Sequence, residues 1–407
     1  MQAVRSAIAL ATFGAKRPSE GPLIGIEVEF LALDAVTNQV VSLEDRVVPA
    51  LEPIAKASRW SMARTAKGVP RYELPGGGSI AFEPGGQVEY ASPPARSPAE
   101  LLVEVRRVQP ALCSALAQNG IRLVGAGIDP FNAVEDVPLQ IQVDRYRLMQ
   151  DYFGSIGPAG VRMMRQTASI QISVDASGDR LRTWKVLNAM APYLVATFAN
   201  SSQYAGGATG WASYRSCTWQ SLDPTRTGIV WDGADPVDAY TRFALDAPAM
   251  LVRSPEDEYL PLRTWVARDA ASEEFVATHL TTLFPEIRPR GYFEVRSVDA
   301  LPPAWLPVPV LLVAGIVMDE RALADADAVL GDPQPGLLRN AATAGLRDPA
   351  IASVARDLAD IALRGCARLG SRVAGADAEV AREYFECTVR RGRNIDAAAQ
   401  NPVPTAA

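Results

Sequence analysis

Short segments that alternate apolar and polar residues recur between residues 25 and 296, and their polar positions hold acids and amides. The segments are GIEVEF at 25–30, FEPGGQVEY at 82–90, TASIQISV at 167–174 and YFEVR at 292–296. Side chains on a β-strand point alternately to its two faces, so each segment has an apolar side and a polar side. The pattern predicts a sheet with one apolar face and one face that gathers carboxylates.

These segments lie far apart in the sequence, so a common face requires one mixed, mostly antiparallel sheet assembled from distant parts of the chain. Strands are predicted at 22–33, 79–92, 121–127, 166–175 and 290–298, and further strands at 226–231 and 249–253. Helices are predicted at 98–119, 143–154, 179–203, 235–246, 273–280, 305–330, 347–371 and 376–391. Irregular insertions are predicted at 59–78 and 205–224.

The same pattern predicts a single catalytic domain over residues 1–407. Its core spans about 21–330, and a helical C-terminal portion at 304–395 packs on the apolar side of the sheet. The tail at 397–407 is predicted to be disordered.

Composition narrows the possible partners and location. The 407 residues are 48% hydrophobic, which is enough for a sizeable core, and the net charge of -6 gives no general attraction for nucleic acid or anionic lipid. Four cysteines without metal-binding spacing and a single histidine argue against a zinc site or a dense disulfide framework. The apolar run at 305–318 is too short to cross a bilayer. We expect a cytoplasmic protein with small-molecule partners that binds neither nucleic acid nor membrane.

Several carboxylates on one face repel each other unless cations neutralise them. Oxygen ligands without histidine or cysteine suit Mg²⁺, or Mn²⁺, and magnesium usually arrives with a nucleotide such as ATP. The candidate metal ligands are Glu27, Glu29, Glu83, Glu89, Gln171 and Glu294. Arg296, on the same face as Glu294, could stabilise charge on a transferring phosphoryl group.

Two observations sharpen this hypothesis. Acids that alternate along a single strand are normally a solvated sheet face, but four such segments, with bulky Tyr292 and Phe293 beside the last, favour an enclosed site. No GxxxxGKS/T motif and no strand-bound GxGxxG is present, which excludes the phosphate-binding devices of P-loop ATPases, protein kinases and Rossmann dehydrogenases. The only histidine, His279, lies in a helical stretch, and we expect it to be structural.

The blocks that carry these residues resemble the plant-like branch of the glutamate-cysteine ligases, and most closely its actinobacterial members that open ergothioneine biosynthesis. They are GIEVEF, FEPGGQVEYASPP, TASIQISVD, FANSS at 198–202 and HLTTLFPEIRPRGYFEVRSVDALP at 279–302. The resemblance implies an α+β, glutamine synthetase-like catalytic fold, in which a curved, mostly antiparallel sheet forms a funnel with helices packed on its outer face. The funnel would hold Mg²⁺, ATP and glutamate.

The resemblance also implies an activity and residue roles. ATP would phosphorylate the side-chain carboxylate of glutamate, and the amine of cysteine would attack the acyl phosphate to give γ-glutamylcysteine, ADP and phosphate. The six candidate ligands would form the metal shell, and Glu294 and Arg296 would be catalytic, with Arg296 contacting the phosphoryl group of ATP. Substrate binding is expected of Arg145, Arg215, Arg226 and Ser173.

Two departures from the family pattern keep alternatives open. Ser173 stands where family members commonly have asparagine, and the segment at 211–220, which is expected to line the acceptor pocket, differs in detail. One alternative is a related ligase that couples glutamate or a similar acid to a different amine. Another is a catalytically silent protein that binds nucleotide or amino acid on the same scaffold.

Overall fold

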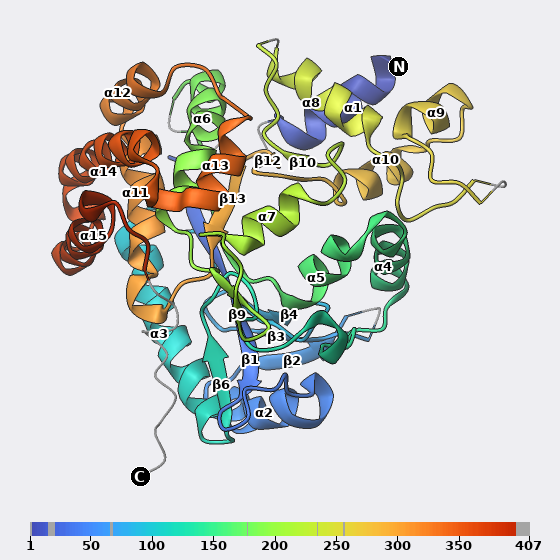
Figure 1. Ribbon diagram of the computed structural model, residues 1–407, viewed down its shortest axis with the longest axis horizontal. Coiled ribbons are helices and arrows are strands. Elements are labelled where there is room, and N and C mark those ends of the chain that lie inside the picture. Colours follow the sequence, from blue (N-terminus) through green and yellow to red (C-terminus); the bar gives the residue numbers. More distant parts are fainter. Residues whose placement is uncertain are drawn as a thin grey trace.

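The computed structural model describes residues 2–14, 21–65, 68–176, 178–233, 235–254 and 257–395, so the predicted tail at 397–407 lies outside the described residues. Nine strands of this described chain form one sheet in the order β12-β13-β7-β1-β5-β4-β3-β2, with β6 also paired to β1, and every pair is antiparallel (Figure 1). The strands are β1 (Ile24–Asp34), β2 (Ser61–Arg64), β3 (Pro70–Glu73), β4 (Ser79–Phe82), β5 (Val88–Ala91), β6 (Ile121–Val124), β7 (Ser169–Val174), β12 (Ile287–Pro289) and β13 (Phe293–Asp299).

The strand register brings the predicted polar residues together. Glu27 of β1 lies opposite Gln171 of β7, Glu29 lies opposite Glu89 of β5, and β13 pairs with the other edge of β7. The register of β13 shifts between Val295 and Val298, so a bulge forms at Arg296. On the opposite face, the predicted apolar residues are all at most 2% exposed: Ile26, Val28, Val88, Ile170, Ile172, Phe293 and Val295. The two-faced sheet is confirmed.

Helices cover both faces of this sheet. In Figure 1, α6, α11, α14 and α15 gather on one side, while α7, α5 and α4 lie on the other side. The helices are α1 (Gln2–Thr12), α2 (Val48–Ala57), α3 (Pro98–Ala117), α4 (Asp144–Ile156), α5 (Pro158–Gln166), α6 (Arg180–Thr197), α7 (Tyr214–Gln220), α8 (Pro236–Asp246), α9 (Leu262–Ala267), α10 (Glu273–Leu280), α11 (Pro307–Val317), α12 (Glu320–Leu330), α13 (Leu337–Ala344), α14 (Pro349–Leu369) and α15 (Gly375–Cys387). Two further ladders are short: β8 (Gln203–Tyr204) with β9 (Gly207–Ala208), and β10 (Thr227–Gly228) with β11 (Phe284–Pro285).

The apolar face of the sheet and the C-terminal helices share one core. Buried side chains of β1, β7 and β13 belong to the same cluster as those of α11 and α14, and every residue of α11 from Val308 to Val317 is buried. Contacts join α11 directly to β7. This continuity supports the prediction of a single domain over the described part of the chain. No helix in the described ranges is both long and apolar enough to span a bilayer.

Several predicted elements were wrong. No strand forms at 249–253, where the chain turns, and the helix predicted at 305–330 is two helices, because Asp319 caps α12 by accepting a hydrogen bond from the Ala322 amide at 2.8 Å. The insertion predicted at 59–78 contains β2 and β3, and the one predicted at 205–224 contains α7. These elements are four to seven residues long, which is too short for hydrophobic periodicity to identify.

Candidate active site

Three carboxylates from two neighbouring strands and the turn between β4 and β5 converge on the polar face. Oxygen atoms of Glu29, Glu83 and Glu89 all lie within 4.8 Å of one another. Glu83 enters the cluster because a tight turn follows β4, with Gly86 at a φ of 88°. A side chain at Gly85 would place its Cβ 2.0 Å from the carbonyl oxygen of Arg165, so only glycine fits there. The turn sequence thus positions an acid.

The cluster is electrostatically strained. Burial, followed by the charges of Glu29 and Glu27, raises the pKa of Glu83 to about 7. Burial and the charge of Glu83 raise the pKa of Glu89 well above its ordinary value. Hydrogen bonds hold Glu29 in place, since its carboxylate accepts from the Ser169 amide at 2.7 Å and from Gln171 Nε2 at 3.0 Å. A divalent cation would relieve the repulsion and lower these pKa values.

This strain predicts how stability depends on pH when no metal is bound. Between about pH 4.5 and pH 7, Glu83 holds a proton in the folded protein that it has lost in the unfolded chain. The free energy of unfolding should therefore fall as pH rises through this window, by about 1.4 kcal/mol per pH unit for each such proton. The melting temperature, measured from pH 5 to 8 in chelator, should decline more steeply for the wild type than for Glu83→Gln. Equal slopes would contradict the raised pKa.

Glu294 sits among arginines and outside the three-carboxylate cluster. Its carboxylate contacts Arg288 Nη2 at 2.7 Å, Arg296 Nη1 at 2.5 Å and Arg290 Nη1 at 3.4 Å. Although burial acts in the opposite direction, the charges of Arg288 and Arg296 lower the pKa of Glu294 to about 2. Arg296 also donates to Gln171 Oε1. Glu294 and Arg296 therefore share a face, as predicted, and the metal role of Glu294 stays a prediction.

The carboxylates and arginines line a cavity of about 220 Å³ between the sheet and helices α4, α5 and α7. Of the predicted residues, Arg145 and Arg215 line this cavity together with Glu27, Glu29, Glu83, Glu89, Gln171 and Arg296. Part of the remaining wall is apolar and includes Met149, Met163, Met164, Trp219 and Phe284. The lining of this cavity thus combines carboxylates, arginines and an apolar surface.

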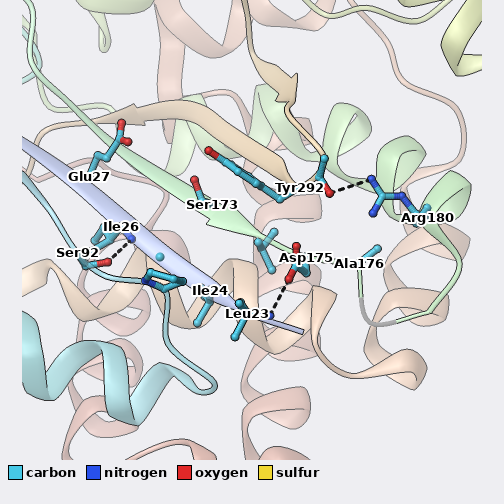
Figure 2. A pocket seen from close by; sticks show the side chains of 14 residues that line it. Leu23, Ile24, Ile26, Glu27, Ser92, Ser173, Asp175, Ala176, Arg180 and Tyr292 are labelled. Carbon is cyan, nitrogen blue, oxygen red and sulfur yellow. Dashed lines mark hydrogen bonds between the residues drawn. The ribbon is translucent and has the colours of Figure 1, made fainter. Parts of the chain in front are cut away.

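A second cavity, of about 350 Å³, adjoins the first at Glu27, which lines both. It lies at the start of β1 and the end of β7, and its lining includes Ser173, Arg180 and Tyr292 (Figure 2). Arg180 donates to the carbonyl oxygen of Gly291 at 3.2 Å, which ties α6 to the turn before β13. Burial, and then the charge of Glu294, raises the pKa of Glu27. The predicted contact residue Ser173 thus belongs to this second cavity.

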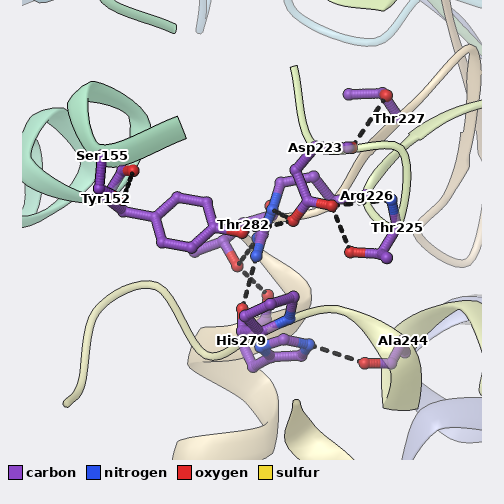
Figure 3. Close-up of polar contacts among 10 residues, drawn as sticks. Tyr152, Ser155, Asp223, Thr225, Arg226, Thr227, Ala244, His279 and Thr282 are labelled. Carbon is purple, nitrogen blue, oxygen red and sulfur yellow. Dashed lines mark hydrogen bonds and ion pairs between the residues drawn. The ribbon is translucent and has the colours of Figure 1, made fainter. Parts of the chain in front are cut away.

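The prediction that Arg226 binds substrate was wrong. Its side chain is fully buried behind the cavity and donates to Asp223 at 2.9 Å, to Thr282 at 3.0 Å and to the carbonyl oxygen of Pro248 at 2.5 Å (Figure 3). These contacts occupy the guanidinium of Arg226 in the region of β10 and β11, and Arg226 lines neither cavity. The sequence around Arg226 gave no sign of this burial, because arginine is normally exposed.

Arg226→Met should therefore damage stability rather than substrate binding. It leaves the buried Asp223 carboxylate without its cationic partner, which we expect to lower the free energy of unfolding by about 3–5 kcal/mol in urea denaturation. Arg382→Met, which breaks an exposed ion pair with Glu379, is the control and should cost about 0–1 kcal/mol. A raised KM with unchanged stability for Arg226→Met would restore the substrate role.

His279 is structural, as expected. Its Nε2 contacts the carbonyl oxygen of Ala244 at 2.9 Å, and burial lowers the pKa of its imidazole to about 4 (Figure 3).

Sequence reasoning missed Arg288, which lines the first cavity. A signal for it existed, because in a hairpin centred on Gly291 residue 288 lies opposite Glu294.

Comparison with known proteins agrees with this geometry. The sequence model of glutamate-cysteine ligase family 2 (GCS2) matches residues 23–396. The glutamate–cysteine ligase EgtA of Mycolicibacterium smegmatis is 31% identical, covering 95% of this chain and 89% of that protein. The chloroplastic glutamate–cysteine ligase of Nicotiana tabacum is 28% identical, covering 86% of this chain and 72% of that protein.

A solved structure supports the fold independently. The glutamate–cysteine ligase GshA of Francisella tularensis, in complex with AMP, superposes with a TM-score of 0.53 at 11% identity, covering 90% of this chain and 82% of that one. At such low identity the likeness concerns the fold alone, and it confirms the predicted glutamine synthetase-like fold. With the family match over most of the chain, these findings show that the chain belongs to glutamate-cysteine ligase family 2.

Proposed function

We propose that this protein is an ATP-dependent ligase that joins the side-chain carboxylate of glutamate to the amine of cysteine and forms γ-glutamylcysteine. The observation that carries the proposal is the three-carboxylate cluster of Glu29, Glu83 and Glu89, which lines one cavity together with arginines in a chain of this family. A free carboxylate is a poor electrophile at neutral pH. The reaction therefore needs a phosphoryl donor and a site that tolerates several anions.

The residues of the cluster fit a magnesium ion. Their donors are all carboxylate oxygens, and burial followed by mutual repulsion raises the pKa values of Glu83 and Glu89. The oxygens lie within 4.8 Å of one another, so small side-chain movements would bring them to one ion, whose ligands lie at about 2.1 Å. We propose Mg²⁺, with Mn²⁺ as a substitute, held by Glu29, Glu83 and Glu89. Glu27, Gln171 and Glu294 are proposed as further ligands. When bound, the ion supplies positive charge that lets the anionic phosphate and carboxylate approach each other.

The two cavities suggest where the substrates lie. ATP is proposed to occupy the cavity of about 350 Å³, near Ser173 and Arg180, with its phosphates towards Glu27. Glutamate is proposed to occupy the smaller cavity, where Arg145, Arg215 and Arg288 can bind carboxylates bidentately. The apolar wall of methionines, Trp219 and Phe284 favours a small sulfur-containing acceptor, because thioethers and aromatic rings make good contacts with sulfur.

The proposed reaction has two steps. An oxygen of the glutamate side-chain carboxylate attacks the γ-phosphorus of ATP, the bond to the β–γ bridging oxygen breaks, and ADP leaves. The amine nitrogen of cysteine then attacks the acyl carbon, phosphate leaves, and the nitrogen loses a proton. Arg296, held against Glu294, is proposed to stabilise the negative charge that spreads over the transferring phosphoryl group.

A direct assay tests the proposal. With ATP, Mg²⁺, glutamate and cysteine, the purified protein should form ADP and γ-glutamylcysteine in equal amounts, and omission of cysteine should stop steady turnover. The absence of ADP at millimolar substrates, with ATP binding detected by calorimetry, would instead support a silent binding protein. A panel of amines in place of cysteine separates the related ligase, since the true acceptor should give the largest kcat/KM.

A further inference from the structure

Asp299, the last residue of β13, is a buried carboxylate that has no place in the site described above. It is 1% exposed and lines neither cavity. Its Oδ2 accepts from the Asn200 amide at 2.9 Å and from Ser201 Oγ at 2.7 Å, and its Oδ1 accepts from Ser213 Oγ at 2.9 Å. A charge buried this deeply is costly unless it is fully bonded, so its contacts indicate what it holds in place.

These contacts converge on the start of α7 and on Arg215. Ser213 caps α7 by accepting from the Ser216 amide at 3.1 Å, and Ser201 Oγ accepts from the Arg215 amide at 3.1 Å. The guanidinium of Arg215 lies 3.6 Å from Asp299 Oδ1 through Nη1. Asp299 therefore fixes both the backbone and the side chain of Arg215.

Arg215 connects Asp299 to the cavity. Its Nη2 donates to the carbonyl oxygen of Arg296 at 2.9 Å, at the bulge that aims the Arg296 side chain, and its guanidinium lies 5.9 Å from the ring of Trp219. Arg215 itself lines the cavity and is only 4% exposed. A cation in a low-dielectric cavity wall stays aimed at substrate when fixed partners hold it, and Asp299 is the anionic partner of Arg215.

We infer that Asp299 is a positioning residue, which acts through Arg215 to orient the cationic wall of the cavity toward an anionic substrate. The inference rests on the proposed function for the identity of that substrate, but the placement of Arg215 does not. Glu29 and Glu286 also lie near Arg215, but Asp299 is the carboxylate whose ion pair with Arg215 the described structure contains, at 3.6 Å.

A double-mutant cycle tests the inference. Asp299→Asn keeps the shape and removes the charge, and Arg215→Lys keeps the charge and removes the planar fork. Each should raise the KM of the same substrate, glutamate or ATP, by about 10- to 100-fold, with kcat changed by less than about threefold. The double variant should be no worse than Arg215→Lys alone. Effects that multiply, or that fall on different substrates, would overturn the inference.

A matched control and a milder variant protect this test from instability. Asp129 is also 1% exposed, but its carboxylate accepts hydrogen bonds from Phe131 and Asn132 and lines neither cavity, so Asp129→Asn should lower stability without changing either KM. Ser201→Ala removes one donor from Asp299 and one acceptor from the Arg215 amide. If Asp299→Asn fails to fold, Ser201→Ala should still raise the KM that Arg215→Lys raises, and unchanged kinetics there would count against the inference.

A structural readout separates this inference from the proposed function. In a crystal structure of Asp299→Asn, or of Ser201→Ala if the former does not fold, the Arg215 guanidinium should leave the Arg296 carbonyl oxygen. If the wild type does not turn over, the proposed ligase activity fails, and displacement of Arg215 alone decides the positioning role. An unmoved Arg215 overturns that role whether or not the enzyme is active.

Discussion

Glu89→Gln should reduce kcat/KM by about 100- to 1000-fold while raising the melting temperature of the metal-free protein. The activity should fall because the cluster with Glu29 and Glu83 loses one of its charged oxygen ligands, and removal of a preorganised charge typically costs about 10²–10³ in rate. The stability should rise because Glu89, whose pKa is raised by burial and by Glu83, no longer repels its neighbours. ADP release and differential scanning fluorimetry measure the two effects.

The control for Glu89→Gln is Glu73→Gln, because Glu73 is an exposed acid at the end of β3 in the same sheet. It should leave both activity and melting temperature almost unchanged. Added Mg²⁺ should stabilise the wild type and the Glu73 variant but not Glu89→Gln. A Glu89 variant that still gains stability from Mg²⁺ would remove this residue from the metal site.

Glu294→Gln is expected to lose activity by a similar factor, about 100- to 1000-fold, but with the opposite change in stability. Glu294 is 1% exposed and holds Arg288 and Arg296, so the neutral amide would leave two partly buried guanidinium groups without this anion. We expect the free energy of unfolding to fall by about 3–5 kcal/mol, with the fold retained in circular dichroism.

Glu294→Asp tests whether the charge of this residue matters more than its reach. The aspartate keeps the anion and should recover most of the lost stability, but its shorter side chain should recover only part of the activity. Retention of full turnover by Glu294→Gln would refute both its metal role and its hold on Arg296.

Loss of stability in Glu89→Gln would show that repulsion is not the dominant effect in the acidic cluster.

The polar face could be predicted because alternation is a local property of each strand. Glu27 with Glu29 and Gln171 with Ser169 take their directions from single strands, and the structure keeps them. The run Pro84-Gly85-Gly86 after Glu83 is likewise a local turn signal, and the structure has a turn there with Gly86 at a φ of 88°. The sheet and its acids therefore follow from short segments of sequence.

The arginines could not be sorted in the same way. Arg215 and Arg226 lie eleven positions apart in one segment, yet the first lines the cavity and the second is buried behind it. The position of each arginine depends on the carboxylate that it pairs with. Arg215 pairs with Asp299 and lies in the short helix α7, and Arg226 pairs with Asp223. Such pairings are set by tertiary packing, which neither charge nor periodicity reveals.

The order of strands in the sheet also determines when the site can exist during synthesis. Central strand β1 pairs with β5 and β7, but β7 is completed only by β13, which brings Glu294 and Arg296. A nascent chain that ends before Ile287 carries all the acids of the cluster and none of the arginines that face Glu294. We therefore expect high contact order to delay closure of the sheet, and ribosome-bound fragments to bind no nucleotide until the β12–β13 hairpin has emerged.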